Sequence, residues 1–469
     1  MLHDSPTRTT PDAAASGLPS RSSTLLGRLA DFVAGISLDR LPEAVMEKAK
    51  CHVLYTMCNA VATGTVADPV APCVAAIGTA FGPCMAWGTT MTGGAGEIAF
   101  LNAVSGSYRA QNDFDPLSAT HPGLVVIPAT LSLAQARKSG GASVLEAVIA
   151  GYEVCTRLAA PMAQSLAARG MRPTAVVGAM AAGAAAARLL GLDVAQTANA
   201  IGLASQVASG TLQCWTEGTP EWRLQFGTAA DAGIRAALLA EQGVVAAQSG
   251  LDGSQGLYCS MTGKVPEMGF EGWSILDVEL QAFPGSAAVQ PVLQALALVL
   301  EERNSSQGTG AVEITFSEEP GFRGPAMEER GLFQAPDQAL ASARFMSAVL
   351  GVHGTEGLSD WRRYVNSARV ANVAARILIR SGQGGGDEIS IRMDGAAPVV
   401  VPRKVFAGHT WRQTVALLAP SARAWSFPKS LERFVALAGG IERLERLDNV
   451  DCLLETIRPA ETTTTKDMR

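Results

Sequence analysis

The sequence predicts a mostly helical protein with a smaller α+β region, and three observations carry this prediction. Hydrophobic residues make up 48% of the 469 residues and charged residues 17%, which is the composition of a core-rich globular protein. Apolar residues recur at helical spacing through the first half of the chain, and alternating segments follow only later. A chain of this length exceeds what one core serves, so two or more folding units are expected.

Helical spacing begins close to the N-terminus. The first such segment carries apolar side chains at Leu25, Leu26, Leu29, Phe32 and Val33. A later helix is expected to begin at Ser143, which with Glu146 three residues on has the pattern of a capping box. Helices are predicted over residues 25–34, 41–63, 70–81, 96–107, 143–158, 176–190, 194–209 and 229–242.

Alternating apolar residues mark the α+β region. Ala311 to Phe316 (AVEITF) and Glu388 to Met393 (EISIRM) are typical of strands, and Ala397 to Val401 offers a partner strand across the turn at Asp394-Gly395. Helices are predicted at residues 290–302, 338–352 and 368–379. The helical pattern returns at residues 431–438 and 441–454.

These patterns divide the chain into four parts. Residues 1–23 are rich in Ser, Thr, Pro and Ala, lack the apolar stretch of a signal peptide, and are expected to form a disordered tail. A helical domain is expected over 24–274 and an α+β domain over 275–409. The last helices, over 410–469, are expected to return to the helical domain.

Charge and cysteine spacing exclude several classes of function. The net charge of −6 gives no basic footprint for nucleic acid. The longest uncharged run is mostly Ala and Gly and is too short and weakly apolar to span a bilayer. The eight cysteines are scattered, without a C-x-x-C and without a nearby His at metal-ligand spacing. We expect reduced, buried thiols in a cytoplasmic protein with no metal site and no membrane or nucleic-acid partner.

Four segments, in this order along the chain, carry a family resemblance. They are AFLNAVSGSYRAQNDFDPLSATHPG (Ala99 to Gly123), VVIPATLSLAQARKSGGASVLEAVIAGYEVCTRLA (Val125 to Ala159), GMRPTAVVGAMAAGAAAARLLGLD (Gly170 to Asp193) and WRLQFGTAADAGIRAALLAEQG (Trp222 to Gly243). Together they resemble the MmgE/PrpD family, which includes 2-methylcitrate dehydratase, cis-aconitate decarboxylase and iminodisuccinate epimerase.

The resemblance implies a fold and a chemistry. It implies a large helical domain, a smaller α+β lid domain inserted before the last helices, and a homodimer. It also implies an enzyme without a metal or organic cofactor, whose chemistry is proton removal or delivery next to a carboxylate or carbonyl of a small molecule.

The resemblance selects His121, in the T-H-P-G motif, as the catalytic acid or base. Imidazole titrates near working pH and can serve in either role. A lone histidine is more often structural, but the motif reverses that expectation here. Four other histidines are expected to be packed or superficial: His3, His52, His353 and His409.

Two aspartates precede His121 in the segment N-D-F-D. The carboxylate of Asp113 is expected to orient His121 through its second ring nitrogen, or to hold a substrate hydroxyl. Asp115 is assigned to substrate binding, although it could instead cap the next element, since it precedes Pro116. The loop is about two residues shorter than in relatives with D-F-D-D-T before the His.

The chain departs from the family where relatives hold basic residues. Arg172 replaces the His before Pro-Thr, and Trp222, followed by Arg223, replaces a Lys. The segment QAFPGSAAVQP replaces K-x-Y-P and a downstream His, giving Gln281, Phe283 and Gln290.

These departures predict a less charged substrate. Burying an unpaired carboxylate costs several kcal/mol, and only Arg172 and Arg223 are left to bind one bidentately. An ion pair with Glu221 is an equally good interpretation of Arg223. Trp222 and Phe283 could be core residues, but an aromatic pocket wall is the interpretation that their aligned positions favour.

Three functions stay open at this stage. The first is a lyase or isomerase in which His121 acts on a non-citrate substrate, in secondary metabolism, by elimination, isomerisation or cyclisation. The second is a conventional 2-methylcitrate dehydratase or cis-aconitate decarboxylase. The third is a catalytically silent binding or dimer-partner paralogue.

Overall fold

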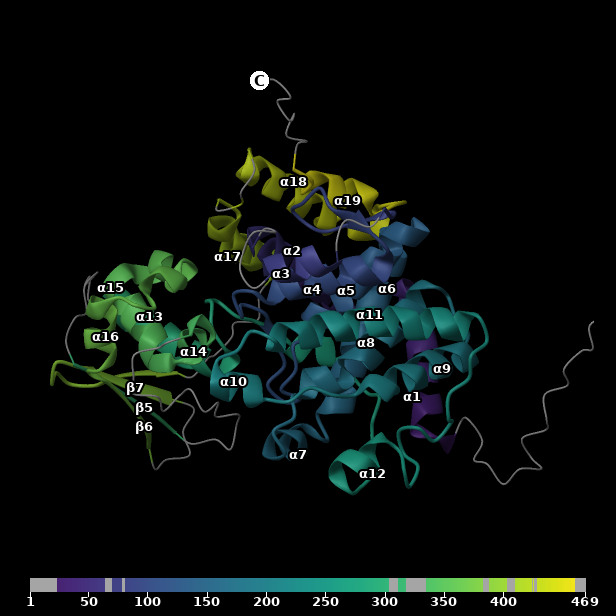
Figure 1. Cartoon of the computed structure of the whole chain (residues 1–469), viewed down its shortest axis with the longest axis horizontal. Coiled ribbons are helices and arrows are strands. Elements are labelled where there is room, and N and C mark those ends of the chain that lie inside the picture. The colour runs from purple at the N-terminus through teal and green to yellow at the C-terminus, as the bar shows by residue number, and fades with distance from the viewer. Residues whose placement is uncertain are drawn as a thin grey trace, which may run out of the picture.

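The computed structural model describes residues 23–63, 70–77, 81–302, 311–317, 335–382, 388–402, 410–423, 425 and 428–459. In these ranges the chain is mostly α-helical, with a smaller strand-containing region towards the C-terminus, as predicted (Figure 1). The predicted tail, apart from Ser23, lies outside the described residues, as does His409. None of the described helices is long and apolar enough to cross a bilayer.

The first part of the chain forms a helical body. Its helices are α1 (Leu25–Ala34), α2 (Glu43–Thr63), α3 (Val70–Ile77), α4 (Ala95–Ser107), α5 (Gly123–Arg137), α6 (Gly141–Ala159), α7 (Ala163–Ala168), α8 (Pro173–Leu189), α9 (Val194–Ala204), α10 (Gln213–Glu217), α11 (Trp222–Glu241) and α12 (Leu257–Thr262). Short antiparallel pairs join β1 (Cys84–Met85) to β2 (Thr92–Gly93) and β3 (Asp113–Phe114) to β4 (Glu279–Leu280).

Helix α8 runs through the middle of this body and packs against α5, α6, α9 and α11. Small residues allow the close approach: a Cβ on Gly233 of α11 would lie 2.6 Å from the backbone nitrogen of Gly183 in α8. The alanine- and glycine-rich sequence of α8 is therefore a packing requirement.

The strand-containing region is a four-stranded sheet covered by helices. Its elements are α13 (Gln290–Glu302), β5 (Val312–Ser317), α14 (Pro336–Ala341), α15 (Ala343–Ser359), α16 (Ala368–Ala374), β6 (Ile377–Gly382), β7 (Glu388–Met393) and β8 (Val399–Pro402). The strand order is β6-β5-β7-β8, and only the β5–β6 pair is parallel. Alternate residues Ile389, Ile391 and Met393 of β7 are buried, as expected for a sheet with one covered face.

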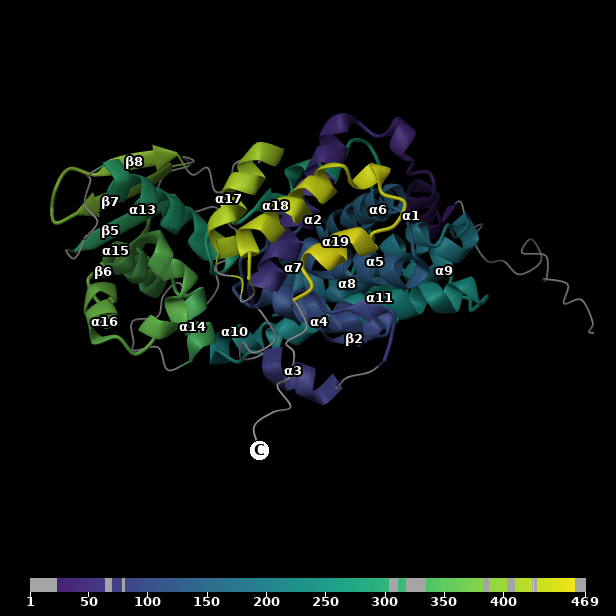
Figure 2. The ribbon, with the colours of Figure 1, turned by 90° about the horizontal axis from the view of Figure 1, so that it is seen from above.

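The last described helices lie against the first part of the chain. Helices α17 (Trp411–Arg423) and α18 (Ser430–Glu442) pack on α2, and α19 (Asp451–Thr456) packs on α18 (Figure 2). The division into a helical domain and an inserted lid, with boundaries at 275 and 409, stays a prediction.

Several local predictions were wrong, among them the following. The helix expected at 368–379 ends at Ala374 and gives way to β6. The helix expected from 229 begins already at Trp222. Helix α6 begins at Gly141, so no capping box forms at Ser143; Glu146 instead accepts a hydrogen bond from the backbone nitrogen of Leu38 and pairs with Arg188.

Candidate active site

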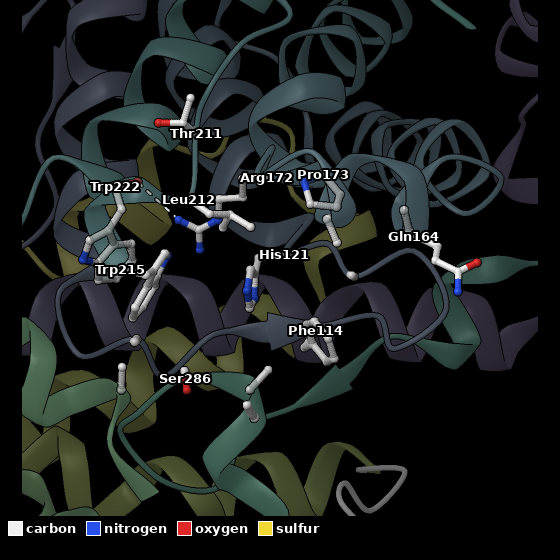
Figure 3. Close-up of a pocket in the computed structure, with 18 of the residues that line it drawn as sticks. Phe114, His121, Gln164, Arg172, Pro173, Thr211, Leu212, Trp215, Trp222 and Ser286 are labelled. Atoms are coloured by element: carbon white, nitrogen blue, oxygen red, sulfur yellow. Dashed lines mark hydrogen bonds between the residues drawn. The ribbon is translucent and has the colours of Figure 1, made fainter. Parts of the chain in front are cut away.

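A cavity of about 860 Å³ lies between the helical body and the strand-containing region. Its walls come from the loop after α4, from α7, from the starts of α8 and α11, from α10, and from the segment 286–288 with the end of α14. His121 lies in the middle of the cavity in Figure 3, below Arg172. The structure thus brings three of the four segments that carry the family resemblance to one cavity.

The His121 ring is held by the backbone of its own loop. Its Nδ1 lies 2.7 Å from the carbonyl oxygen of Asp113, and its backbone nitrogen donates to Thr174 Oγ1 at 3.0 Å. A carbonyl can only accept, so Nδ1 carries the proton and Nε2 keeps its lone pair. The ring packs against Phe114 and Phe226, with centroids 5.2 and 6.1 Å away.

The surroundings keep this imidazole neutral. Burial, and to a lesser extent the nearby Arg172, lower the pKa of His121 to about 3, although the hydrogen bond to the Asp113 carbonyl acts in the opposite direction. A neutral ring with a free Nε2 can accept a proton from a substrate, and its protonated form is a strong acid.

The carboxylate of Asp113 does not touch His121, contrary to the sequence prediction. It accepts hydrogen bonds from the backbone nitrogen of Gly123 at 3.0 Å and from the Tyr152 hydroxyl at 2.6 Å. His52 Nδ1 lies 3.4 Å away. Burial raises the pKa of Asp113 to about 7, against the lowering effect of the bonds from Tyr152 and Gly123. The Asp113 carboxylate therefore holds strand β3 in place, and the Asp113 backbone carbonyl orients the imidazole.

Asp115 shapes the loop and is not part of the cavity wall. Its carboxylate accepts from the backbone nitrogen of Ser118 at 3.0 Å, and its own nitrogen donates to the Thr120 carbonyl at 2.9 Å. Asp115 is buried and closes the turn that contains Leu117 and Ala119, both of which line the cavity.

Arg172 is the buried cation of the cavity. It precedes Pro173 at the start of α8, and its guanidinium carbon lies 4.4 Å from the Phe226 ring and 5.3 Å from the Trp222 ring. One Nη donates weakly to the Trp222 carbonyl at 3.4 Å, and within the described part of the chain no carboxylate pairs with the guanidinium. Burial lowers its pKa to about 10, so it is still a cation at neutral pH.

Trp222 lines the cavity together with Trp215, which stacks on it at a centroid distance of 4.8 Å. Arg223 points elsewhere: it forms a buried ion pair with Asp337 of α14 and donates to the Tyr108 carbonyl at 3.0 Å. The partner is thus Asp337 and not Glu221. The same Asp337 oxygen accepts from the Trp222 indole nitrogen at 3.1 Å, which fixes the aromatic wall.

Gln281, Phe283 and Gln290, from the segment QAFPGSAAVQP, lie outside the cavity wall, and the two glutamines bind backbone groups. Gln281 Oε1 accepts from the backbone nitrogen of Asn112 at 2.8 Å. The Gln290 amide bridges the backbone of Phe283, accepting from its nitrogen at 3.2 Å and donating to its carbonyl at 2.9 Å. None of the three side chains is part of the cavity wall.

The sequence analysis did not identify four residues of the site, Trp215, Phe226, Tyr152 and Asp337, and it expected His52 only to be packed. Phe226 follows Trp222 by four residues in a helix, so helical spacing could have found it. His52 and Tyr152 reach Asp113 from α2 and α6, and no local pattern signals such long-range contacts. Among the described residues, no group of three His, Cys, Asp or Glu side chains converges as a metal site would.

Comparisons with known proteins identify the family of this chain. Residues 27–268 match the family model "MmgE/PrpD N-terminal domain". The chain is 28% identical over 257 residues to the cis-aconitate decarboxylase-like protein oryM of Aspergillus oryzae, covering 51% of this chain and 52% of that protein. It is 32% identical over 216 residues to cis-aconitate decarboxylase of Homo sapiens (43% and 44%), and 27% identical over 258 residues to that of Aspergillus terreus (51% and 50%).

The aligned part thus spans about half the length of these relatives. The family model, however, covers more than half of the 469 residues, and it includes His121, Arg172 and Trp222. The chain belongs to the MmgE/PrpD family.

Proposed function

We propose that this protein is a lyase or isomerase that acts on a carboxylate substrate less charged than citrate, with His121 as the acid–base group. The observation that carries the proposal is that one cavity holds both a neutral imidazole and a buried guanidinium that forms no ion pair with the described carboxylates. The arrangement fits proton transfer next to a carboxylate, because Arg172 can hold the carboxylate while Nε2 of His121 faces the neighbouring carbon.

Each residue has a distinct role in this proposal. Arg172 binds the carboxylate bidentately and stabilises the negative charge that develops on it when the adjacent carbon loses a proton. His121 takes that proton at Nε2. Because its pKa is low, the imidazolium readily returns the proton to a leaving group or to another carbon, which gives elimination, isomerisation or an assisted cyclisation. Asp113 is a positioning residue, since only its backbone carbonyl contacts the ring.

The charge of the cavity argues for a substrate with one or two carboxylates. Arg223 is neutralised by Asp337, and the positions of Gln281 and Gln290 hold amides that bind the backbone. Of the described residues that line the cavity, Arg172 and the exposed Arg169 are the cations. The stacked Trp215 and Trp222 favour an apolar portion in the ligand. Such a substrate suits a biosynthetic pathway of secondary metabolism.

Cis-aconitate decarboxylation is the second candidate, because two of the relatives reported above carry that name. The two candidates separate in a direct assay of the purified protein with cis-aconitate, citrate and 2-methylcitrate. We expect negligible turnover of all three. Turnover of any of them at rates normal for a metabolic enzyme would replace the first proposal by the conventional one.

The acid–base role has its own test, once a substrate is found. His121→Ala should lower turnover about 10²–10⁴-fold, as positioned acid–base catalysts do, with the fold retained. Asp113→Asn, which keeps the backbone carbonyl, should lower it much less. Wild-type turnover in His121→Ala would contradict the proposal and leave a silent binding protein as the better interpretation.

A further inference from the structure

The cavity continues past His121, away from Arg172 and towards α7. Figure 3 shows Trp215 and Trp222 on one side of His121 and Gln164 of α7 on the other. With about 860 Å³, the cavity lies towards the upper end of the range of roughly 300–1,000 Å³ found for sites that bury drug-sized ligands. A small polycarboxylic acid held at Arg172 and His121 would therefore leave the α7 end unfilled.

One face of α7 lines this end of the cavity. The lining positions are Ala163, Gln164, Ala167 and Ala168, whose spacing places them on the same side of a helix. The alanine side chains at three of these positions leave space that larger residues would fill.

The loop between Asp115 and His121 supplies further lining residues, among them Pro116 and Leu117. Leu117 is 76% exposed, although the hydrogen bond from the Ser118 backbone nitrogen to the Asp115 carboxylate fixes the loop around it. An apolar side chain held at the rim of a cavity gains burial when an apolar ligand enters. Arg169, at the end of α7, also lines the cavity, but it is exposed and its charge is solvated.

We infer that the α7 end is a subsite for an alkyl or aryl arm of the substrate, with Ala167 and Leu117 as specificity-determining residues. The inference rests on the proposed function for one point only, the carboxylate at Arg172 that sets the direction of the arm. Catalysis at His121 is not needed for it, so binding alone can test it.

The test is a calorimetric titration of the full chain with straight-chain saturated carboxylates from butanoate to decanoate. In the wild-type protein, each added methylene group should lower the dissociation constant about three- to fourfold until the arm reaches the end of the subsite. Ala167→Phe should flatten this dependence on chain length. Leu117→Ser, at an exposed position that does not threaten folding, should reduce it.

Ser165→Phe is the matched control, because it adds the same bulk to the same helix at a position that does not line the cavity, and it should keep the wild-type dependence. An affinity that does not change with chain length in the wild-type protein would overturn the inference. A dependence that survives both Ala167→Phe and Leu117→Ser would overturn it as well.

The role of Arg172 as the carboxylate-binding residue is tested by a separate variant. Arg172→Gln should weaken the binding of every chain length by a similar factor. If Arg172→Gln weakens the binding of none of these carboxylates, Arg172 does not bind the carboxylate and the proposed function is contradicted. The dependence of affinity on chain length still decides whether the subsite for the arm exists.

Discussion

The side-chain and backbone oxygens of Asp113 have different tasks. The backbone carbonyl binds the His121 ring, whereas the carboxylate is buried among the Gly123 nitrogen, the Tyr152 hydroxyl and His52. The sequence could place an aspartate near the histidine, because both lie in one short loop. It could not tell which oxygen points to the ring, since that depends on strand β3 and on its pairing with β4.

The Asp113 carboxyl should make the stability of the protein depend on pH. Its pKa is raised to about 7 by burial, against about 3.9 in an unfolded chain. Between these values the folded protein holds a proton that the unfolded chain has lost, so the contribution of this carboxyl to the free energy of unfolding falls as the pH rises from about 4 to about 7. The His121 ring, whose pKa is lowered to about 3, contributes in the opposite sense.

Asp113→Asn removes this titration and should shift the slope of the free energy of unfolding against pH towards more positive values, in urea unfolding measured at several pH values across that range. Glu279, whose pKa burial also raises to about 7, keeps part of the slope, and Glu279→Gln serves as the companion variant. The same slope in wild type and Asp113→Asn would show that the Asp113 carboxyl titrates normally in the folded protein.

Helices α11 and α14 are joined by the buried ion pair between Arg223 and Asp337. Asp337 also fixes the Trp222 indole, so one carboxylate sets both the charge and the shape of the cavity wall. The sequence singled out Arg223 as a candidate carboxylate-binding residue and offered Glu221 as its alternative partner. A residue more than a hundred positions away leaves no local signal, and such pairs are visible only in the folded chain.

Asp337→Ala should destabilise the protein by about 3–5 kcal/mol, because it leaves the buried Arg223 without its carboxylate. The measurement is the midpoint of urea unfolding. The control is Asp360→Ala, which breaks an exposed pair with Arg363 and should change stability by no more than about 0.5–1 kcal/mol. Equal effects of the two variants would contradict the buried-pair assignment.

Across the whole molecule, strong helical periodicity was the reliable guide. Helix α1 lies at the predicted residues, and the alternating segments became β5 and β7 of one sheet. Strand β6 was missed because its residues continue an apolar pattern that also suits a helix, and its pairing with β5 decides the outcome. The segments aligned by family resemblance put His121, Arg172 and Trp222 around one cavity, whereas Gln281 and Gln290 lie behind the loop.

The assembly state is a prediction about the whole molecule. We expect a homodimer, which the family resemblance implies. Light scattering at micromolar concentration should give twice the chain mass of 48.6 kDa. A stable monomer under the same conditions would contradict the expectation, and it would not affect the assignments within the cavity.

The central claim is that His121 faces the cavity as a neutral imidazole with its proton on Nδ1. The most direct measurement is nitrogen-correlated NMR of the histidine-labelled protein, which has only five imidazoles, with His121→Gln to assign the signal. We predict the Nδ1–H form at pH 7 and no protonation of this ring down to about pH 5, because burial and Arg172 both lower its pKa. A ring protonated on Nε2 alone at pH 7, or one that titrates near the ordinary value of about 6.5, would contradict the claim.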